Sequence, residues 1–444
     1  MNNKNFGEKL TAHVKEYAVT YLFIAISAFF FAVSDQDLSY TTTQLILRLN
    51  RNAFIVLALI IPIVAGMGIN FAITIGAMAA QIGLLLAINW GITGPKGILV
   101  AALITLPLGS LFGLLIGKLL NKMKGQETIG SMILGYFATG LYQLLFLFIF
   151  GKIIPMNDNV SIVGSTGIKN TLNLTGETDL YMAVDGMVRV NLLTAVYVVC
   201  AIIALWALFR FFRKKIEKKQ MIVSVAAAAV IAVIFLLPGV KKLFDGSLAG
   251  NGKPTTIPLV TWLLVLLLCG FNSMIMKTRI GQKFRAVGQN RTVANASGID
   301  VDKTRIIAIM ISTVLAGWGQ IIFMQSEGIG TFQTYSAHEQ VGLYAGAAIL
   351  VGGASIDRAS NSQALIGTFL FHLMFITATG AATRLFGDSA IGEYFRAFLS
   401  YGVIALALVM YAWRGVKGVM KDKGKKHTKS VKTDDKPKDA PAEN

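Results

Sequence analysis

Residues 281–325 read GQKFRAVGQNRTVANASGIDVDKTRIIAIMISTVLAGWGQIIFMQ, and this stretch decides the class of the fold. Its first part, 281–305, is polar and basic, whereas 306–325 contains no charged residue. A helix of about 20 apolar residues is long enough to cross the ~30 Å hydrocarbon core of a bilayer. Hydrocarbon offers no water to backbone N–H and C=O groups, so such a segment must be helical. The stretch therefore predicts a polar turn that leads into a membrane-spanning helix.

Similar apolar segments recur on both sides of this stretch. We count twelve, at about 17–34, 53–69, 71–93, 97–117, 128–151, 191–209, 221–238, 258–276, 306–325, 341–355, 362–380 and 395–413. The chain is 54% hydrophobic and only 14% charged, whereas soluble domains carry about 25% charged residues. The sequence predicts an all-α, polytopic transmembrane helical bundle of about 10–12 spans. Gly66, Gly68, Gly352 and Gly353 are expected to break or bend some of these helices.

The basic residues gather on one side of the predicted membrane. Twelve crossings place one set of segments together: 1–16, 118–127, 210–220, 277–305, 356–361 and 414–444. These segments hold 30 of the 41 Lys and Arg residues and 12 of the 23 acidic residues, so they carry the whole formal charge of +18. Lys and Arg concentrate in cytoplasmic loops. Both termini are therefore predicted to be cytoplasmic, in a bacterial plasma (inner) membrane.

The same count divides the chain into three regions. Residues 1–16 form a cytoplasmic N-terminus, 17–413 the membrane domain, and 414–444 a basic tail whose composition predicts disorder. Two loops are long: 155–190 outside and 277–305 inside. The outer loop has room for a short helix or hairpin. The basic excess orients the chain and attracts anionic lipid, and it does not indicate nucleic acid.

Residue patterns for chemistry are missing from the sequence. It contains no GxxxxGK[ST] loop and no HExxH pair. The His and Cys residues are scattered: His13, His338, His372, His427, Cys200 and Cys269. We therefore predict no catalytic residue, no metal site and no cofactor, and we expect any ATP to be bound by a separate chain. A membrane-embedded enzyme would need an ionisable cluster that these segments lack.

Apart from Arg396 near the start of the last one, the twelve apolar segments contain no Asp, Glu, Lys or Arg. Proton-coupled carriers usually bury titratable groups in the membrane, so energy for uphill transport is expected to enter from outside this chain. An ion-coupled secondary transporter that binds sodium through carbonyls and hydroxyls stays open as the alternative. The uncharged polar residues within the segments are candidates for a translocation pathway, or for hydrogen bonds between helices: Asn70, Gln81, Asn89, Gln143, Asn272 and Gln320.

The inner loop has the signals of a rigid elbow. Residues 281–296 favour a helix with Phe284, Val287 and Val293 along one side. Gly298 is placed to end that helix, and Asp302 to cap the next one. Such an elbow can pass a push from a soluble partner into the membrane. A merely amphipathic surface helix has the same pattern, so both interpretations stay open at this point.

The motif RAVGQNRTVANASGIDVDKTR, then STVLAGWGQI and AAILVGGAS, resembles the permease family of ABC importers that includes ribose-type and branched-chain amino acid permeases. The likeness is specific over 281–355 and looser over 55–413, where GMGINFAITIGAMAAQIG, 66–83, is similar to a broken-helix region of the family. Two departures leave the substrate open. Asp357 and Arg358 interrupt the stretch after the GG turn, and an acidic residue often found near positions 71–73 in sugar permeases is absent.

The resemblance implies an ABC importer permease fold and a coupling helix that docks on an ATPase subunit. The residues that this assigns to the ATPase contact are Arg285, Ala286, Val287, Gly288, Asn290, Ala296, Gly298 and Ile299. It also implies two ATPase subunits, an extracytoplasmic solute-binding protein, and a second copy of the permease or a related one. The implied activity is alternating-access import of a small polar solute, a monosaccharide or nucleoside, with an amino acid as the further candidate. The twelve segments and the 155–190 loop exceed what a compact member of the family needs.

Overall fold

The structure is a computed structural model. It describes residues 17–123, 125–150, 153–157, 163–164, 167–168, 171–172, 174–176, 179–213, 217–244, 254–329, 333–334, 337–355, 357–388, 390–399, 401–402 and 405. The predicted N-terminus, 1–16, and the predicted tail, 414–444, lie outside these residues. Of the predicted twelfth segment, 395–413, the structure describes residues 395–399, 401–402 and 405. Residues 390–399 are helical.

Helices make up almost all of the described structure. They are α2 Ala18–Ser34, α3 Leu38–Leu57, α4 Ile60–Val64, α5 Ile73–Asn89, α6 Gly94–Lys122, α7 Glu127–Phe148, α8 Leu192–Phe212, α9 Lys218–Leu236, α10 Pro238–Phe244, α11 Leu259–Ile275, α12 Arg279–Gln289, α13 Arg291–Ala296, α14 Val301–Gln325, α15 Val341–Val351 and α16 Asn361–Phe386. Ten of the first eleven predicted segments each overlap one of these helices, whereas 53–69 takes in the end of α3, all of α4 and part of the break after it. The expected helical membrane bundle is confirmed, although several helix boundaries differ from those predicted.

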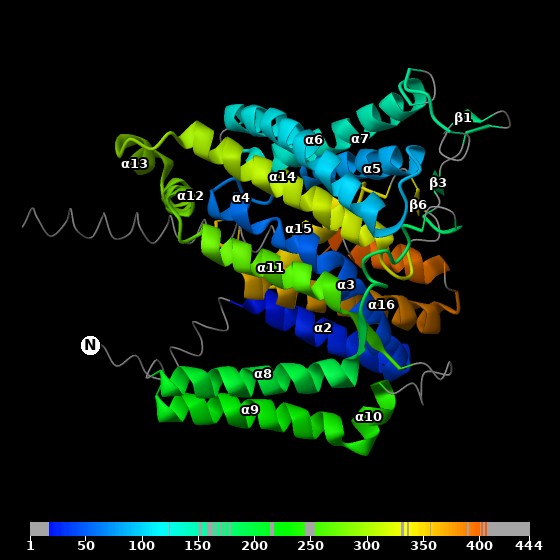
Figure 1. Ribbon diagram of the computed structural model, residues 1–444, viewed down its shortest axis with the longest axis vertical. Coiled ribbons are helices and arrows are strands. Elements are labelled where there is room, and N and C mark those ends of the chain that lie inside the picture. The colour runs from blue at the N-terminus through cyan, green and yellow to red at the C-terminus, as the bar shows by residue number, and fades with distance from the viewer. Residues whose placement is uncertain are drawn as a thin grey trace, which may run out of the picture.

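The long helices lie roughly parallel, with α14 in the middle of the bundle (Figure 1). Helix α14 packs against α3, α5 and α6, whereas α16 packs against α2, α3 and α15. Small residues permit these close approaches. A Cβ at Gly113 of α6, for example, would lie 2.6 Å from the Cα of Met310 on α14. Helices α12 and α13 stand at one end of the bundle, which we call the elbow face (Figure 1, left).

The other end of the bundle, which we call the opposite face, carries the short strands of the described residues (Figure 1). They are β1 Val163–Gly164, β2 Gly167–Ile168, β3 Thr171–Leu172, β4 Arg189–Asn191, β5 Thr256–Pro258 and β6 Gln333–Thr334. All three pairs, β1–β2, β3–β6 and β4–β5, are antiparallel. Strands β1 and β2 lie in the long loop 155–190, for which the sequence left room for a short helix or a hairpin.

Two glycine-containing breaks divide helices as predicted. Gly66 and Gly68 have φ angles of 72° and 68°, a region that glycine enters without strain, and the chain there is not helical between α4 and α5. Helix α15 ends at Val351, and Gly353 follows with φ 88°. A Cβ at Gly352 would lie 1.8 Å from the carbonyl oxygen of Gln363, so glycine lets the end of α15 touch the start of α16.

Six helical segments of the described chain are long and apolar enough to cross a membrane. They are Leu38–Val64, Gly94–Lys122, Leu192–Phe212, Lys218–Leu236, Val301–Gln325 and Asn361–Phe386. The count rises to seven if α11 and α12, which bend by 75° at their junction, are taken as one span. Helices α2, α5 and α15 are apolar but shorter. The helices are therefore more uneven in length than the predicted spans.

Helices α8 and α9 form a hairpin at the margin of the bundle (Figure 1). They pack on each other, on α10 and at the β4–β5 pair. Ala228 is the one buried residue of α9, although the helix is strongly apolar. A helix that is apolar all round and unburied suits hydrocarbon rather than water. The hairpin therefore presents most of its surface to the membrane.

A buried polar cluster fastens the loop before β4 to the ends of α11 and α14. The Asp185 carboxylate accepts hydrogen bonds from the hydroxyl of Thr261 and from Gln325 Nε2, the latter at 2.9 Å. Gln325 Oε1 accepts the backbone N–H groups of Val184 and Asp185, at 3.0 and 3.2 Å. Gln325 thus joins α14 to the loop through both ends of its amide.

We expect Gln325→Leu to lower the stability of the purified chain by about 1–3 kcal/mol, because it leaves buried N–H groups and a carboxylate without their partner. The measurement is the thermal unfolding midpoint in detergent. Gln143→Leu is the control, since Gln143 is exposed on α7. Equal midpoints for the two variants would show that the cluster does not hold the loop.

Candidate functional site

The inner loop forms two helices rather than the single expected one. The Thr278 hydroxyl accepts the N–H of Gly281 at the start of α12. Asn290 ends α12 with extended backbone, φ −159° and ψ 108°, and its Oδ1 accepts the N–H of Val293 at 3.1 Å, which caps α13. A side-chain cap satisfies the free N–H groups of a first turn, so Asn290 starts a new helix.

The inner side of α12 is packed against the membrane helices. Phe284 and Val287 are buried, as expected for one apolar side. A Cβ at Gly288 would lie 2.1 Å from the Val64 carbonyl oxygen, and a Cβ at Gly66 would lie 2.8 Å from the Gly288 Cα. The backbones of α12 and of the break after α4 are therefore in direct contact.

The residues assigned to an ATPase contact do not share one face. Arg285, Asn290, Ala296 and Gly298 are exposed, and Ala286, Gly288 and Ile299 are half-buried. Val287 points into the bundle and is 1% exposed, so it supports the elbow from within. The expectation that Val293 shares the buried side is wrong. It is 60% exposed, because the break at Asn290 turns α13 away.

At the end of the elbow, the structure confirms one prediction from the sequence, at Gly298, and corrects another, at Asp302. Gly298 has φ 78°, the left-handed conformation expected after a helix end. The predicted cap Asp302 is wrong, because α14 begins at Val301 and is capped by Asp300. The Asp300 Oδ1 accepts the N–H of Lys303 at 2.9 Å. The helix starts earlier than its hydropathy indicates.

A buried ionic cluster joins the elbow to three other elements. Glu127, the first residue of α7, accepts Arg291 Nη1 at 2.8 Å and Arg305 Nη2 at 2.5 Å. Arg291 also donates to the Gly66 carbonyl at 2.8 Å, and Arg305 Nε lies 2.7 Å from the sulfur of Met67. Arg305 is fully buried. The cluster links α7, α13 and α14 to the break after α4, and sequence reasoning missed it.

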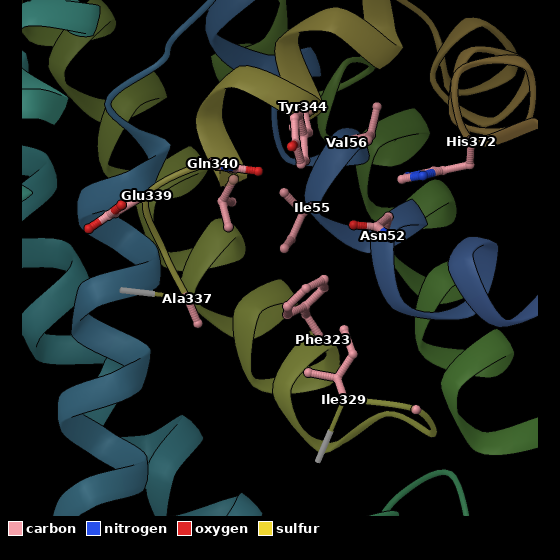
Figure 2. Close-up of a pocket in the computed structure, with 13 residues that line it drawn as sticks. Asn52, Ile55, Val56, Phe323, Ile329, Ala337, Glu339, Gln340, Tyr344 and His372 are labelled. Atoms are coloured by element: carbon pink, nitrogen blue, oxygen red, sulfur yellow. The ribbon is translucent and has the colours of Figure 1, made fainter. Parts of the chain in front are cut away.

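A cavity of about 510 Å³ lies in the half of the bundle toward the opposite face. Its lining comes from α3, the end of α14 and the segment after it, the start of α15, and α16: Asn52, Ile55, Val56, Phe323, Gly328, Ile329, Ala337, Glu339, Gln340, Val341, Tyr344, Ala345 and His372. Figure 2 shows the His372 ring and the Asn52 amide directed into this space, whereas the Glu339 carboxylate points away from it. The first turn of α15 opens onto the cavity.

The predicted pathway residues do not line this cavity. Gln81 and Gln320 support its wall instead. Gln81 Oε1 lies 2.9 Å from His338 Nδ1, and Gln320 Nε2 donates to the Ala337 carbonyl at 3.4 Å. These contacts hold the segment that leads into α15. The other four residues lie elsewhere: Asn70 in the break after α4, Asn89 at the exposed end of α5, Gln143 on α7, and Asn272 against α3 and α16.

The expectation of charge-free spans is wrong for this bundle. Helix α3 begins at Leu38, so Arg48 and Arg51 fall within the apolar segment Leu38–Val64. Hydropathy alone placed the start of this segment at residue 53, because the polar side chains between residues 38 and 52 lower its average. These polar side chains belong to the first part of α3. Two of them, Arg48 and Arg51, lie one helical turn before the cavity-lining residues Asn52 and Ile55.

A second cavity, of about 560 Å³, lies between α6, α11 and α14. Its lining is apolar apart from Ser110, so it offers little to a polar solute. Among the described residues, no three His, Cys, Asp or Glu side chains are grouped to hold a metal ion. The first cavity is therefore the better candidate for binding a polar molecule.

Comparison with known proteins gives one family and several relatives. The family model described as "Branched-chain amino acid transport system / permease component" matches residues 41–412. The autoinducer 2 import system permease protein LsrC of Klebsiella pneumoniae is 28% identical over 156 residues, which cover 33% of this chain and 44% of that protein. The probable branched-chain amino acid transport permease protein LivH of Methanocaldococcus jannaschii is 31% identical over 166 residues, 36% of this chain and 47% of that protein.

The ribose import permease protein RbsC of Escherichia coli is 26% identical over 161 residues, 36% of this chain and 47% of that protein. Each of these three matches therefore spans less than half of the relative's length. No solved structure matches the chain.

Proposed function

Since this chain belongs to the family of branched-chain amino acid transport system permease components, we propose that it is the membrane subunit of an ATP-driven importer for a small polar solute. The solute class that we propose is a monosaccharide or a nucleoside, with an amino acid as the second candidate. The relatives named for import of ribose and of autoinducer 2 support a small polar solute. ATP would be bound and hydrolysed by a separate ATPase subunit, and no residue of this chain would be catalytic.

The observation that carries this proposal is the two-sided elbow. Helices α12 and α13 expose Arg285, Asn290 and Val293 on the elbow face. Their inner side is fixed to the bundle through the Gly66–Gly288 backbone contact, the ion pair of Arg291 with Glu127 and the hydrogen bond of Arg291 to the Gly66 carbonyl. A soluble subunit docked on the exposed side would therefore move the break after α4 together with the elbow.

That break also reaches the cavity. The Phe71 N–H donates to the Ser131 hydroxyl at 3.0 Å, which fixes the end of the break against α7. A Cβ at Gly342 of α15 would lie 2.4 Å from the Phe71 carbonyl oxygen, so the two backbones touch. Movement at the elbow has a continuous packed route, through residues 66–71 and the first turns of α15, to the cavity wall. Packed interfaces with discrete arrangements are the means by which small shifts open and close such sites.

In the proposed cycle, ATP-driven closure of the partner ATPases pushes the elbow and exposes the cavity alternately to the two sides of the membrane. An extracytoplasmic solute-binding protein would deliver the solute, and a second copy of this chain or a related permease would complete the pathway. The charge distribution supports a cytoplasmic elbow face and cytoplasmic termini.

We expect Arg285→Glu to abolish the stimulation of the partner ATPase by solute-loaded binding protein, because the charge at the exposed elbow is inverted. Gly298→Pro should do the same, since proline cannot adopt φ 78°. The assay is ATP hydrolysis by the reconstituted complex in vesicles. Arg213→Glu is the control, because Arg213 is exposed at the end of α8 on the elbow face.

Unchanged stimulation in both elbow variants would reject the coupling role. Accumulation of solute by vesicles that contain this chain without any ATPase would instead support the alternative, an ion-coupled secondary transporter.

A further inference from the structure

Two arginines stand beside the cavity inside an apolar span. Arg48 precedes Asn52 by one helical turn, and Arg51 precedes Ile55 by one turn, so both sit just above lining residues of α3. The guanidinium of Arg51 is 4.0 Å from the Cβ position of Gly328, another lining residue. Arginines within a membrane span face a partner or a water-filled cavity. Arg51 thus lies against the cavity wall at Gly328, and Arg48 lies one helical turn from the lining residue Asn52.

Neither arginine has a carboxylate partner in the part of the chain that the structure describes. The ion pairs found there do not include Arg48 or Arg51. Glu393 is paired with Arg396 at 2.6 Å, and Glu339 accepts Gln143 Nε2 at 3.2 Å with its carboxylate turned from the cavity (Figure 2). The buried Nε of Arg48 has no hydrogen-bond acceptor. Glu393 is near enough to act on Arg48 electrostatically, but its ion pair is with Arg396, so within the described residues neither Arg48 nor Arg51 has a carboxylate of its own.

Further hydrogen-bond donors converge on the same space. His372 is 5% exposed, its Nδ1 has no partner, and its ring is directed into the cavity (Figure 2). Arg48 and Arg51 are close enough to this ring to act on it electrostatically. Helix α15 begins at Val341 in the cavity wall, so the positive end of its dipole lies beside the same space. All of these features favour a negative charge in the cavity.

We propose that this cavity binds a solute with an anionic group, a carboxylate or a phosphate on a small polar skeleton. Arg48 and Arg51 receive the anionic group, and His372 donates to it or to a neighbouring oxygen. Asn52, Gln340 and Tyr344 are left to bind the hydroxyl groups of the skeleton. The inference rests on the proposed function and narrows its solute class to small polar molecules that carry a carboxylate or a phosphate.

The test is ligand-dependent thermal stability of the purified full chain in nanodiscs of neutral lipid. The probes are ribose, ribose 5-phosphate and galacturonate, with sodium chloride at equal ionic strength as the salt control. We expect one or both acidic probes to raise the unfolding midpoint, and ribose and sodium chloride to leave it unchanged. Comparison of the phosphate with the carboxylate tells which anionic group the site prefers.

Arg48→Gln and Arg51→Gln are expected to weaken the apparent affinity for the acidic probe by roughly ten- to a hundredfold, the range for a lost hydrogen bond to a charged group. Lys96→Gln is the control, because Lys96 is exposed near the start of α6 on the opposite face. If a substitution by itself lowers the unfolding midpoint, the quantity compared is the change in midpoint that the probe causes in that variant and in the wild-type chain.

Equal stabilisation by ribose and by the acidic probes, kept in both arginine variants, would overturn the inference and leave the proposed function intact. No shift with any probe would reject the cavity as the solute site. A shift with the acidic probes, together with no ATPase stimulation of the wild-type complex, would support the anion site and reject the importer.

Discussion

Replacement of Glu127 by alanine is expected to destabilise the chain by about 3–5 kcal/mol, the largest loss that we expect from any single substitution considered. Glu127 is 6% exposed, and it is the carboxylate that both Arg291 and Arg305 contact. Arg291 keeps access to solvent, but Arg305 is fully buried. Removal of Glu127 therefore leaves a buried positive charge without its counter-ion.

The measurement is the thermal unfolding midpoint of the detergent-solubilised chain, with Glu217→Ala as the control, because Glu217 is exposed on the elbow face before α9. The double variant Glu127→Ala/Arg305→Met should recover part of the loss, since it removes the unpaired charge and keeps an apolar side chain of similar length. If Glu127→Ala and Glu217→Ala have the same unfolding midpoint, the ionic cluster does not stabilise the bundle.

Gly288→Val is expected to produce a folded chain that no longer couples. A Cβ at residue 288 would lie 2.1 Å from the Val64 carbonyl oxygen and 3.2 Å from the Gly66 nitrogen, so α12 has to move away from the break. Overpacking of this kind costs about 1–3 kcal/mol, which corresponds to a roughly 5- to 150-fold change in the equilibrium between two arrangements of the elbow.

The expected result is normal membrane expression with stimulation of the partner ATPase lowered within that range. Gly270→Ala is the matched control, because a Cβ at Gly270 on α11 meets no atom within 4 Å. Wild-type stimulation in Gly288→Val would mean that the backbone contact does not transmit the movement of the elbow. If Gly288→Val is not expressed, the same ATPase assay is made with Gly288→Ala, whose smaller side chain requires less displacement of α12.

The features that the sequence predicts well are those with local causes. Apolar length alone identifies the membrane helices, and Gly298 marks the end of the elbow because its φ angle belongs to glycine. The predicted face of the elbow fails where one side chain redirects the backbone. Asn290 caps a second helix, and Val293 is thereby turned outward.

The candidate site depends on contacts between distant parts of the chain, which one sequence does not show. Glu127, Arg291 and Arg305 come from three separate elements, and nothing in their spacing indicates that they meet. Arg48 and Arg51 fell outside the predicted span because the first half of α3 is rich in polar residues and so has a low average hydropathy. The sequence left open whether a buried amide such as Gln81 lines a pathway or makes a hydrogen bond within the bundle, and in the structure Gln81 contacts His338 in the segment that leads into α15.

The α8–α9 hairpin has a consequence for how this architecture can vary. Both of its helices are long enough to cross a membrane, and its two ends meet where Arg189 of β4 pairs with Pro258 of β5. Because two crossings return the chain to the side from which it departed, gain or loss of the whole hairpin leaves the in–out orientation of every later helix unaltered. The two helices can therefore be gained or lost together without a change in topology. Gain or loss of a single helix at the same place would reverse the in–out orientation of all later helices.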